Sequence, residues 1–104
     1  MAWLYLLAAG LLEAVWALLL KQSASFTRIW PSIGFAGAAA ISLVLLALAL
    51  RTIPVGTAYG VWTGIGAMMT FGAGIVLLGE NSSALRLASV ALIAAGLVGL
   101  RVGA

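Results

Sequence analysis

Cysteine and histidine are absent from this sequence, and only 7% of its 104 residues are charged. Without cysteine the chain has no disulfides and no thiol chemistry, and without histidine it lacks the usual zinc ligands. We therefore expect no metal site and no bound cofactor. We also expect no enzyme, because the sequence contains no pairing of a nucleophile with a base and no phosphate-binding loop.

The charged residues that are present are mostly basic, giving a net charge of +3. The five basic residues are isolated from one another, at Lys21, Arg28, Arg51, Arg86 and Arg101. Because nucleic-acid binding needs basic residues in a cluster or stripe, we do not expect a nucleic-acid partner. A soluble domain has about 25% charged and about 45–50% apolar residues, whereas this chain is 65% hydrophobic. The composition therefore favours a lipid bilayer as the solvent.

The charges divide the chain into apolar stretches that are long enough to cross a membrane, which takes about 20 residues. Between Arg28 and Arg51 lie 22 uncharged residues, and between Arg51 and Glu80 lie 28. The last stretch, after Arg86, has only 14 uncharged residues before the next arginine. It reaches full length if its helix begins near residue 83 and that arginine extends to the interface. The first stretch is apolar except for Glu13.

We therefore predict an all-α membrane protein in which residues 1–104 form a single transmembrane domain. Its four helices are expected at about residues 2–20, 31–50, 55–78 and 84–102. Pro31 and Pro54 suit first helical turns, and "GENSS" at 79–83 provides a glycine stop and then polar caps. We expect no cleaved signal peptide, because the start lacks a basic segment and Glu13 interrupts its apolar run.

The basic residues give the chain almost no preferred orientation in the membrane. Lys21, Arg28 and Arg86 fall on one side, and Arg51 and Arg101 fall on the other with the N-terminal amine. Orientation normally follows an excess of basic residues on the cytoplasmic side, and here that excess is nearly zero. We predict dual topology, in which copies insert both ways; the alternative is that one loop dominates and the orientation is single.

Glu13 lies near the middle of the first helix, where an acid costs about 2.5–3.5 kcal/mol on insertion scales. Such residues usually face a bundle interior and bind ions or protons. The helical repeat places Glu13 on the same helix face as Trp16 and as three small residues, Ala9, Gly10 and Ala17. This pattern favours a cation site in which a proton and a cation compete for one carboxylate, which would produce exchange. The alternative is a protonated glutamate that only helps the helices to pack.

Polar and aromatic residues at a similar depth in the second and third helices are further candidates for this site. Ser42 lies near the middle of its helix; the alternative interpretation is a hydroxyl that bonds back to the preceding turn. Tyr59 and Trp62 share one face of the third helix, but they could equally be interfacial belt aromatics. Gly64 and Gly66, around Ile65, make bending easier and are a candidate hinge. Close packing against a neighbouring helix is the alternative explanation for these glycines.

A transport path needs more than four helices, so we expect two chains with two facing glutamates. Dual topology would make that pair an antiparallel homodimer, a two-chain version of the inverted repeats found within secondary transporters. The last helix is the candidate dimer contact, because Ala91, Ala95 and Gly99 form a ridge of small residues.

The residues that carry these features resemble the small multidrug resistance (SMR) family. The resemblance lies in "AWLYLLAAGLLEAVWALLLK" (2–21), "FTRIWPS" (26–32), "IPVGTAYGVWTGIGA" (53–67) and "LIAAGLVGL" (92–100). It runs almost from end to end, and a first-helix glutamate together with P-x-G-x-A-Y-x-x-W-x-G-x-G is highly specific. The resemblance implies an antiparallel homodimeric exporter of the bacterial inner membrane that is driven by proton antiport.

The chain is most similar to the guanidinium-exporter branch of that family, which exports guanidinium and close relatives such as guanylurea. "EAVWA" places Trp16 where the multidrug branch tends to have glycine, and Ser42 stands where that branch tends to have a bulkier aromatic. Guanidinium is planar and matches a carboxylate in bidentate fashion, and its faces stack on aromatic rings.

The resemblance also implies roles for individual residues. Glu13 would bind guanidinium and protons, Trp16 and Ser42 would hydrogen-bond and orient it, and Tyr59 would contact the site and gate it. Trp62 would be an aromatic wall, Gly10 would line the cavity, and residues 64–66 would bend. Ser89 and Gly96 fall in the family's dimer motif of the last helix, although Ser89 stands where a glycine is often found, which leaves the packing of that helix open.

Other functions remain open from the sequence. The nearest alternative is a multidrug or quaternary ammonium exporter on the same scaffold. A heterodimer with a second, unlike chain is possible, because some family members work as such pairs. From a different class, the chain could be a structural or assembly subunit of a larger membrane complex.

Overall fold

In the computed structural model, which describes residues 1–103, the chain forms four α-helices and no strand. They are α1 (Ala2–Gln22), α2 (Ile29–Ala49), α3 (Val55–Leu78) and α4 (Ala84–Val102). Each is long and apolar enough to cross a membrane. The prediction of an all-α membrane protein is therefore confirmed, and the chain is a multi-pass membrane protein. Ala104, the last residue of the expected domain, lies outside the described residues.

The helix ends lie within two residues of the expected positions. Helix α2 begins at Ile29, two residues before Pro31, so the proline is the third residue of the helix. Proline is accepted there because the first N–H groups of a helix have no partner within the helix. Gly79 ends α3 with a φ of +67°, and the Ser83 side chain caps α4 by accepting a hydrogen bond from the Arg86 backbone N–H.

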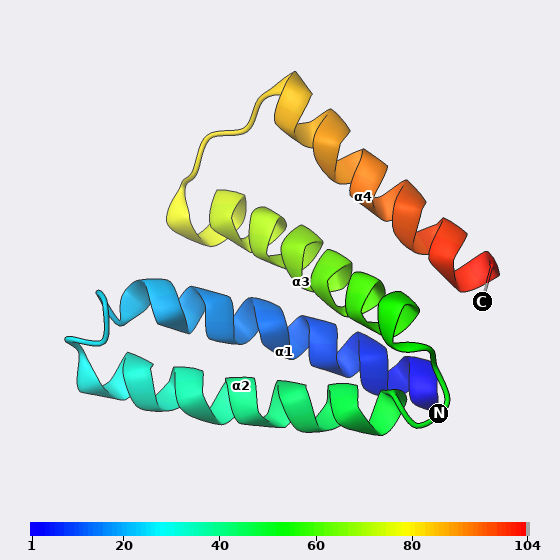
Figure 1. Ribbon diagram of the computed structural model, residues 1–104. Coiled ribbons are helices and arrows are strands. Elements are labelled where there is room, and N and C mark those ends of the chain that lie inside the picture. Colours follow the sequence, from blue (N-terminus) through cyan, green and yellow to red (C-terminus); the bar gives the residue numbers. More distant parts are fainter. Residues whose placement is uncertain (104) are drawn as a thin grey trace.

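The helices lie side by side in the order α2, α1, α3, α4 (Figure 1). Helices α1 and α2 form an antiparallel hairpin, and α3 packs on α1 and makes few contacts with α2. Helix α4 contacts α3 and otherwise diverges from the rest, and none of its residues is buried. The chain therefore consists of a packed three-helix body with a fourth helix that has most of its surface free.

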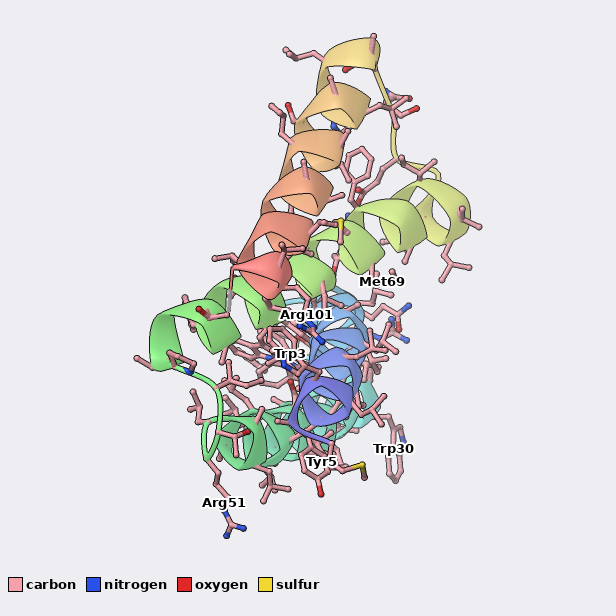
Figure 2. All side chains as sticks on the ribbon, turned by 90° about the vertical axis from the view of Figure 1, so that its right-hand side faces the viewer. Trp3, Tyr5, Trp30, Arg51, Met69 and Arg101 are labelled. Carbon is pink, nitrogen blue, oxygen red and sulfur yellow. The ribbon has the colours of Figure 1, made fainter. Side chains whose placement is uncertain are left out.

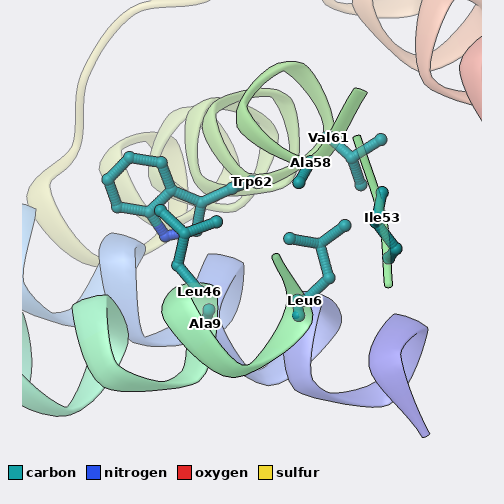
Figure 3. Packing of buried hydrophobic residues seen from close by; sticks show 8 residues of the cluster. Leu6, Ala9, Leu46, Ile53, Ala58, Val61 and Trp62 are labelled. Atoms are coloured by element: carbon teal, nitrogen blue, oxygen red, sulfur yellow. The ribbon is translucent and has the colours of Figure 1, made fainter. Parts of the chain in front are cut away.

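The buried core lies between α1, α2 and α3. Figure 3 shows its side chains converging from these helices, with Trp62 of α3 facing Leu46 of α2. The cluster is built from apolar residues that are at most 9% exposed: Leu6, Ala9, Leu46, Ala49, Ile53, Ala58, Val61 and Trp62. Small residues in this cluster let the helices approach closely, which is the main source of helix association in lipid.

Two glycines mark close approaches of α3 to α1 and to α4. A Cβ atom at Gly10 would lie 2.6 Å from Cγ2 of Ile65, and one at Gly64 would lie 2.6 Å from Cδ2 of Leu97. Helix α3 is continuous through residues 64–66. Close packing, which was the alternative to a hinge, is therefore observed at Gly64, and bending at these residues stays a prediction.

The connection between α1 and α2 has an unusual backbone. Ala24, Ser25 and Phe26 all have positive φ angles, of 49°, 61° and 67°. The left-handed conformation costs an L-residue roughly 1–2 kcal/mol. Buried Ser23 holds the turn, since its hydroxyl donates to the Leu20 carbonyl at 2.6 Å and accepts from the Phe26 backbone N–H at 3.1 Å. The turn is thus fixed by hydrogen bonds rather than by glycine.

The end of α4 is tied to the start of α1. The guanidinium carbon of Arg101 lies 4.6 Å from the centre of the Trp3 ring, and Figure 2 shows the two side chains together. Arg51, in the connection between α2 and α3, extends away from the helices in the same view. Both arginines are exposed, as expected for residues at the ends of membrane spans.

Candidate functional site

Glu13 faces α3 from the middle of α1. Its side chain lies directly against the backbone of Gly66, where a Cβ atom would overlap Oε1 and lie 2.6 Å from Cδ. The glycine therefore provides the space that the carboxylate occupies. Oε1 of Glu13 is buried and has no hydrogen-bond partner within the described residues. A carboxylate oxygen in that state is an acceptor available to a proton or a cation.

This carboxylate lines a cavity of about 410 Å³ between α1 and α3. The wall on α1 is formed by residues on one helical face, and the wall on α3 is formed by small, hydroxyl and aromatic residues. The lining residues are Glu13, Trp16 and Ala17 of α1, Thr63, Gly66, Ala67, Thr70 and Phe71 of α3, Glu80 of the connection between α3 and α4, and Arg86 of α4. A cavity of this size accommodates a small organic ion.

Trp16 lies on the same wall as Glu13, one helical turn further along α1. Its indole Nε1 is buried and has no hydrogen-bond partner within residues 1–103, and its ring stacks edge-on against Phe35 at 5.6 Å. The site therefore contains one unpartnered donor and one unpartnered acceptor. The expected direct hydrogen bond from Trp16 to Glu13 is not formed in the single chain.

Ser42 lies at a junction between α1, α2 and α3. Its hydroxyl donates to the Ala9 carbonyl at 2.7 Å and accepts from the Trp62 indole N–H at 3.0 Å, and its side chain is fully buried. A bond back to its own helix, considered from the sequence, is therefore wrong. Since its one proton is donated to Ala9, Ser42 does not donate to Glu13. In an α-helix the Ala9 carbonyl accepts from the Glu13 backbone N–H, so Ser42 acts on the turn that carries the glutamate.

The other predicted site residues lie beside the cavity rather than in its lining. Trp62 is buried in the core, so the belt interpretation of this residue is wrong. Tyr59 is 57% exposed, with its ring 5.7 Å from that of Trp62. Gly10 lies against Ile65 and is not in the lining of this cavity in the single chain, so its expected place in the site stays a prediction. The structure thus brings Glu13, Trp16 and Gly66 together and places Ser42 and Trp62 behind them.

Sequence reasoning missed the exposed end of the cavity, which we call the mouth and define by Phe71, Glu80 and Arg86. Glu80 follows α3, and its carboxylate Oε2 accepts a hydrogen bond from Nζ of Lys21 at 2.9 Å. This hydrogen bond and the charge of Lys21 lower the pKa of the Glu80 carboxyl from its ordinary value. The signal that was available is that α1 and α3 end on the same side, so the residues following them meet.

The predicted dimer contact on α4 is free in the single chain. All five of its residues are exposed: Ser89, Ala91, Ala95, Gly96 and Gly99. A Cβ atom at Gly96 or Gly99 would meet nothing within 4 Å. The ridge of Ala91, Ala95 and Gly99 lies on the far side of α4 from Leu97, which packs on α3.

Within residues 1–103 no group of three histidine, cysteine or acidic residues is placed to hold a metal ion. The polar groups of the cavity are instead two carboxylates, two hydroxyls, an indole N–H and, at its exposed end, the guanidinium of Arg86, with aromatic rings beside them. This arrangement suits an organic cation, which carboxylates bind through charge and hydrogen bonds.

Comparison with known proteins places the chain among small transporters. A family model described as "Small Multidrug Resistance protein" matches residues 1–93. The Guanidinium exporters of Citrobacter freundii and Klebsiella oxytoca are each 54% identical over 101 residues, which cover 97% of this chain and 96% of the relative. The Guanidinium exporter of Salmonella typhi is 53% identical over 104 residues, covering 100% of this chain and 99% of the relative. The likeness therefore extends over nearly the whole length.

Proposed function

Because the chain belongs to the small multidrug resistance family, we propose that it is a proton-coupled antiporter that exports guanidinium and closely related guanidinyl cations such as guanylurea. It acts as an antiparallel homodimer in the bacterial inner membrane, and it is not an enzyme. The full-length relatives named as guanidinium exporters support the substrate class and the transport activity. Because these relatives come from bacteria, they also support the location in the bacterial inner membrane.

One observation carries the substrate assignment: the buried Oε1 of Glu13 has no hydrogen-bond partner among residues 1–103, and Glu13 lines a cavity of about 410 Å³. Guanidinium donates paired N–H groups that match a carboxylate in bidentate fashion. Its weakly hydrated faces stack on aromatic rings such as Trp16 and Phe71, which line the same cavity. A quaternary ammonium ion lacks N–H donors, so it would gain charge attraction but no hydrogen bonds from this oxygen.

Coupling follows from the use of one acid for two ligands. A proton and guanidinium both bind the Glu13 carboxylate, and neither binds while the other is present. If the empty, charged site rarely changes sides, each crossing carries one ligand or the other. The proton gradient therefore drives the cation out of the cell.

Two chains complete the path. Helix α4 supplies the dimer contact through its exposed small residues, which are the ridge of Ala91, Ala95 and Gly99 together with Ser89 and Gly96. In the dimer, Gly10, Trp16, Ser42, Tyr59 and Trp62 line or orient the paired Glu13 sites, and Gly64 to Gly66 bend when access changes sides. Tyr59 is 57% exposed in the single chain, which leaves its ring available to a second copy.

The test is transport by purified protein in liposomes. We expect the wild-type chain alone to exchange guanidinium for protons, with an apparent affinity for guanidinium that falls as pH is lowered, because protons compete for Glu13. Glu13→Gln removes the charge at nearly constant volume and should abolish both binding and coupling, and Glu13→Asp should retain coupling with weaker binding.

The proposal would be refuted by proton-driven guanidinium uptake in the Glu13→Gln variant. A wild-type chain that transports tetraalkylammonium ions in preference to guanidinium would instead support the multidrug alternative. A chain that transports neither cation alone would point to an unlike partner chain or to a structural role.

A further inference from the structure

A second carboxylate lines the same cavity as Glu13. Glu80 lies at the mouth, just beyond the end of α3, and α1 ends on the same side of the molecule (Figure 1). Its position is fixed by two contacts with α3: its backbone N–H donates to the Gly74 carbonyl at 3.1 Å, and its Oε1 packs over Gly74. Of the two acidic residues in the sequence, both therefore border one cavity.

The carboxylate of Glu80 forms an ion pair with Lys21 of the same chain. Nζ of Lys21 lies 2.9 Å from its Oε2, and the side chains of Lys21 and Glu80 are 63% and 38% exposed. Ion pairs exposed to this degree are weak, because water and salt screen them. Lysine is also a point charge, whereas guanidinium binds a carboxylate through two parallel hydrogen bonds. A free guanidinium ion is thus chemically equipped to replace Lys21 at Glu80.

The mouth also shows how a guanidinium group packs there. The guanidinium carbon of Arg86 lies 5.1 Å from the centre of the Phe71 ring, and Arg86 also hydrogen-bonds the Asn81 carbonyl. Phe71 therefore accepts a guanidinium group on its face, beside a carboxylate, in the single chain. This is the combination of charge and aromatic surface that the proposed substrate needs.

We propose that Glu80 and Phe71 form a second guanidinium subsite at the mouth, in which the substrate replaces Lys21 at Glu80 and Arg86 on the face of Phe71 before it reaches Glu13. This inference rests on the proposed function. Lys21 and Glu80 act in opposite directions on the substrate: Glu80 attracts it, and Lys21 competes with it. A pair that only clamped α1 to the end of α3 would instead be weakened in the same way by loss of either partner.

The test compares the KM for guanidinium of reconstituted wild-type, Glu80→Gln and Lys21→Gln proteins at low and at physiological ionic strength. We expect Glu80→Gln to raise KM roughly threefold to tenfold with little change in maximal rate, because a charge at the rim acts on association. Lys21→Gln should lower KM, and both effects should shrink in salt. Arg51→Gln, which removes a positive charge from an exposed site outside the mouth, is the matched control and should leave KM unchanged.

Gly74→Ala displaces the carboxylate without removing its charge. A Cβ atom at Gly74 would lie 2.6 Å from Oε1 and 3.1 Å from Cδ of Glu80, so the flexible side chain must move. We expect this variant also to raise KM, whereas Gly72→Ala, whose Cβ meets nothing within 4 Å, should not. Alanine is the better helix former, so both variants keep α3 intact.

The outcomes separate this inference from the proposed function. A wild-type protein that does not transport guanidinium overturns both. Normal wild-type transport with an unchanged KM in Glu80→Gln and Gly74→Ala overturns the subsite alone. A rise in KM in both Glu80→Gln and Lys21→Gln also overturns it, because that result identifies the pair as a structural clamp.

Discussion

Gly66 and Glu13 are matched across the contact between α3 and α1. The glutamate side chain fills the space where another residue would carry its Cβ atom, and this fit aims Oε1 at the cavity. Room for the carboxylate therefore depends on a missing side chain in a different helix. Even a methyl group added at Gly66 must move the acid.

Gly66→Ala should lower guanidinium kcat/KM roughly tenfold to hundredfold, because displacement of a reacting group by about 1 Å is costly. Gly72→Ala, on the same helix with nothing within 4 Å of its Cβ, is the matched control and should retain wild-type transport. Both are measured by guanidinium uptake in liposomes. Equal uptake by the two variants would show that the carboxylate does not need its position against Gly66.

Ser42 is the other residue whose role is fixed by contacts between helices. Ser42→Ala removes one bond to Ala9 and one from Trp62, and we expect it to destabilise the fold by about 1–2 kcal/mol, since such bonds in membranes are modest. Ser32→Ala is the control, because the Ser32 hydroxyl bonds only within the first turn of its own helix. The measurement is unfolding of the purified protein in mixed detergent. An equal effect of the two variants would contradict the proposed junction.

Glu13 was identifiable from the sequence because an isolated acid in an apolar helix is conspicuous on grounds of cost alone. The partners of Ser42 were not, because Ala9 lies 33 residues away and Trp62 lies 20 residues away. From the sequence, Glu80 only marks the boundary between the third and fourth membrane spans. Its membership of the cavity depends on how α3 packs along α1, which no local pattern reports.

At the scale of the helices, spans are the most predictable feature, because charged residues bracket them and the bilayer fixes their length. The start of α2 was misplaced because proline is tolerated throughout a first turn, not only at its first residue. The left-handed turn at Ala24 to Phe26 was not predictable, since none of its three residues is glycine. Where α4 packs was also open, because its small residues fit any close contact.

Helix α4 offers a clear test of the dimer. Gly99→Leu adds a large side chain to the exposed ridge and should convert dimers to monomers while the fold of each chain is kept, because a Cβ atom at Gly99 would meet nothing within 4 Å among the described residues outside its own helix backbone. Ala84→Leu, at the exposed first residue of α4, is the control and should leave the dimer intact. Cross-linking in detergent measures the dimer fraction. A fully dimeric Gly99→Leu protein would remove the ridge from the interface.

For the molecule as a whole, the ends of the helices carry nearly balanced positive charge. The connection between α1 and α2 and that between α3 and α4 lie on one side, and the two termini lie on the other with the connection between α2 and α3 (Figure 1). Arg28 and Arg51 are exposed on opposite sides. A single charge change should therefore shift the orientation of the whole chain.

Reporter fusions at the C-terminus should give activity on both sides of the membrane for the wild-type chain. Arg28→Gln should shift the balance one way and Arg51→Gln the other, since each removes one positive charge from opposite sides. The ratio of cytoplasmic to periplasmic reporter activity is the measurement. A wild-type reporter confined to one side would exclude dual topology.

The turn between α1 and α2 constrains how this molecule can move. The three residues with left-handed backbone conformation are held by the buried Ser23, so the turn has little freedom to move. Ser42 joins α1 and α2 a second time, near the middle of both helices. Helices α1 and α2 therefore form a rigid hairpin, and Glu13 has a fixed position on it. A rearrangement that changes the direction of the Glu13 side chain must therefore rotate the α1–α2 hairpin as a rigid body or slide α3 along it. It cannot proceed by separating α1 from α2.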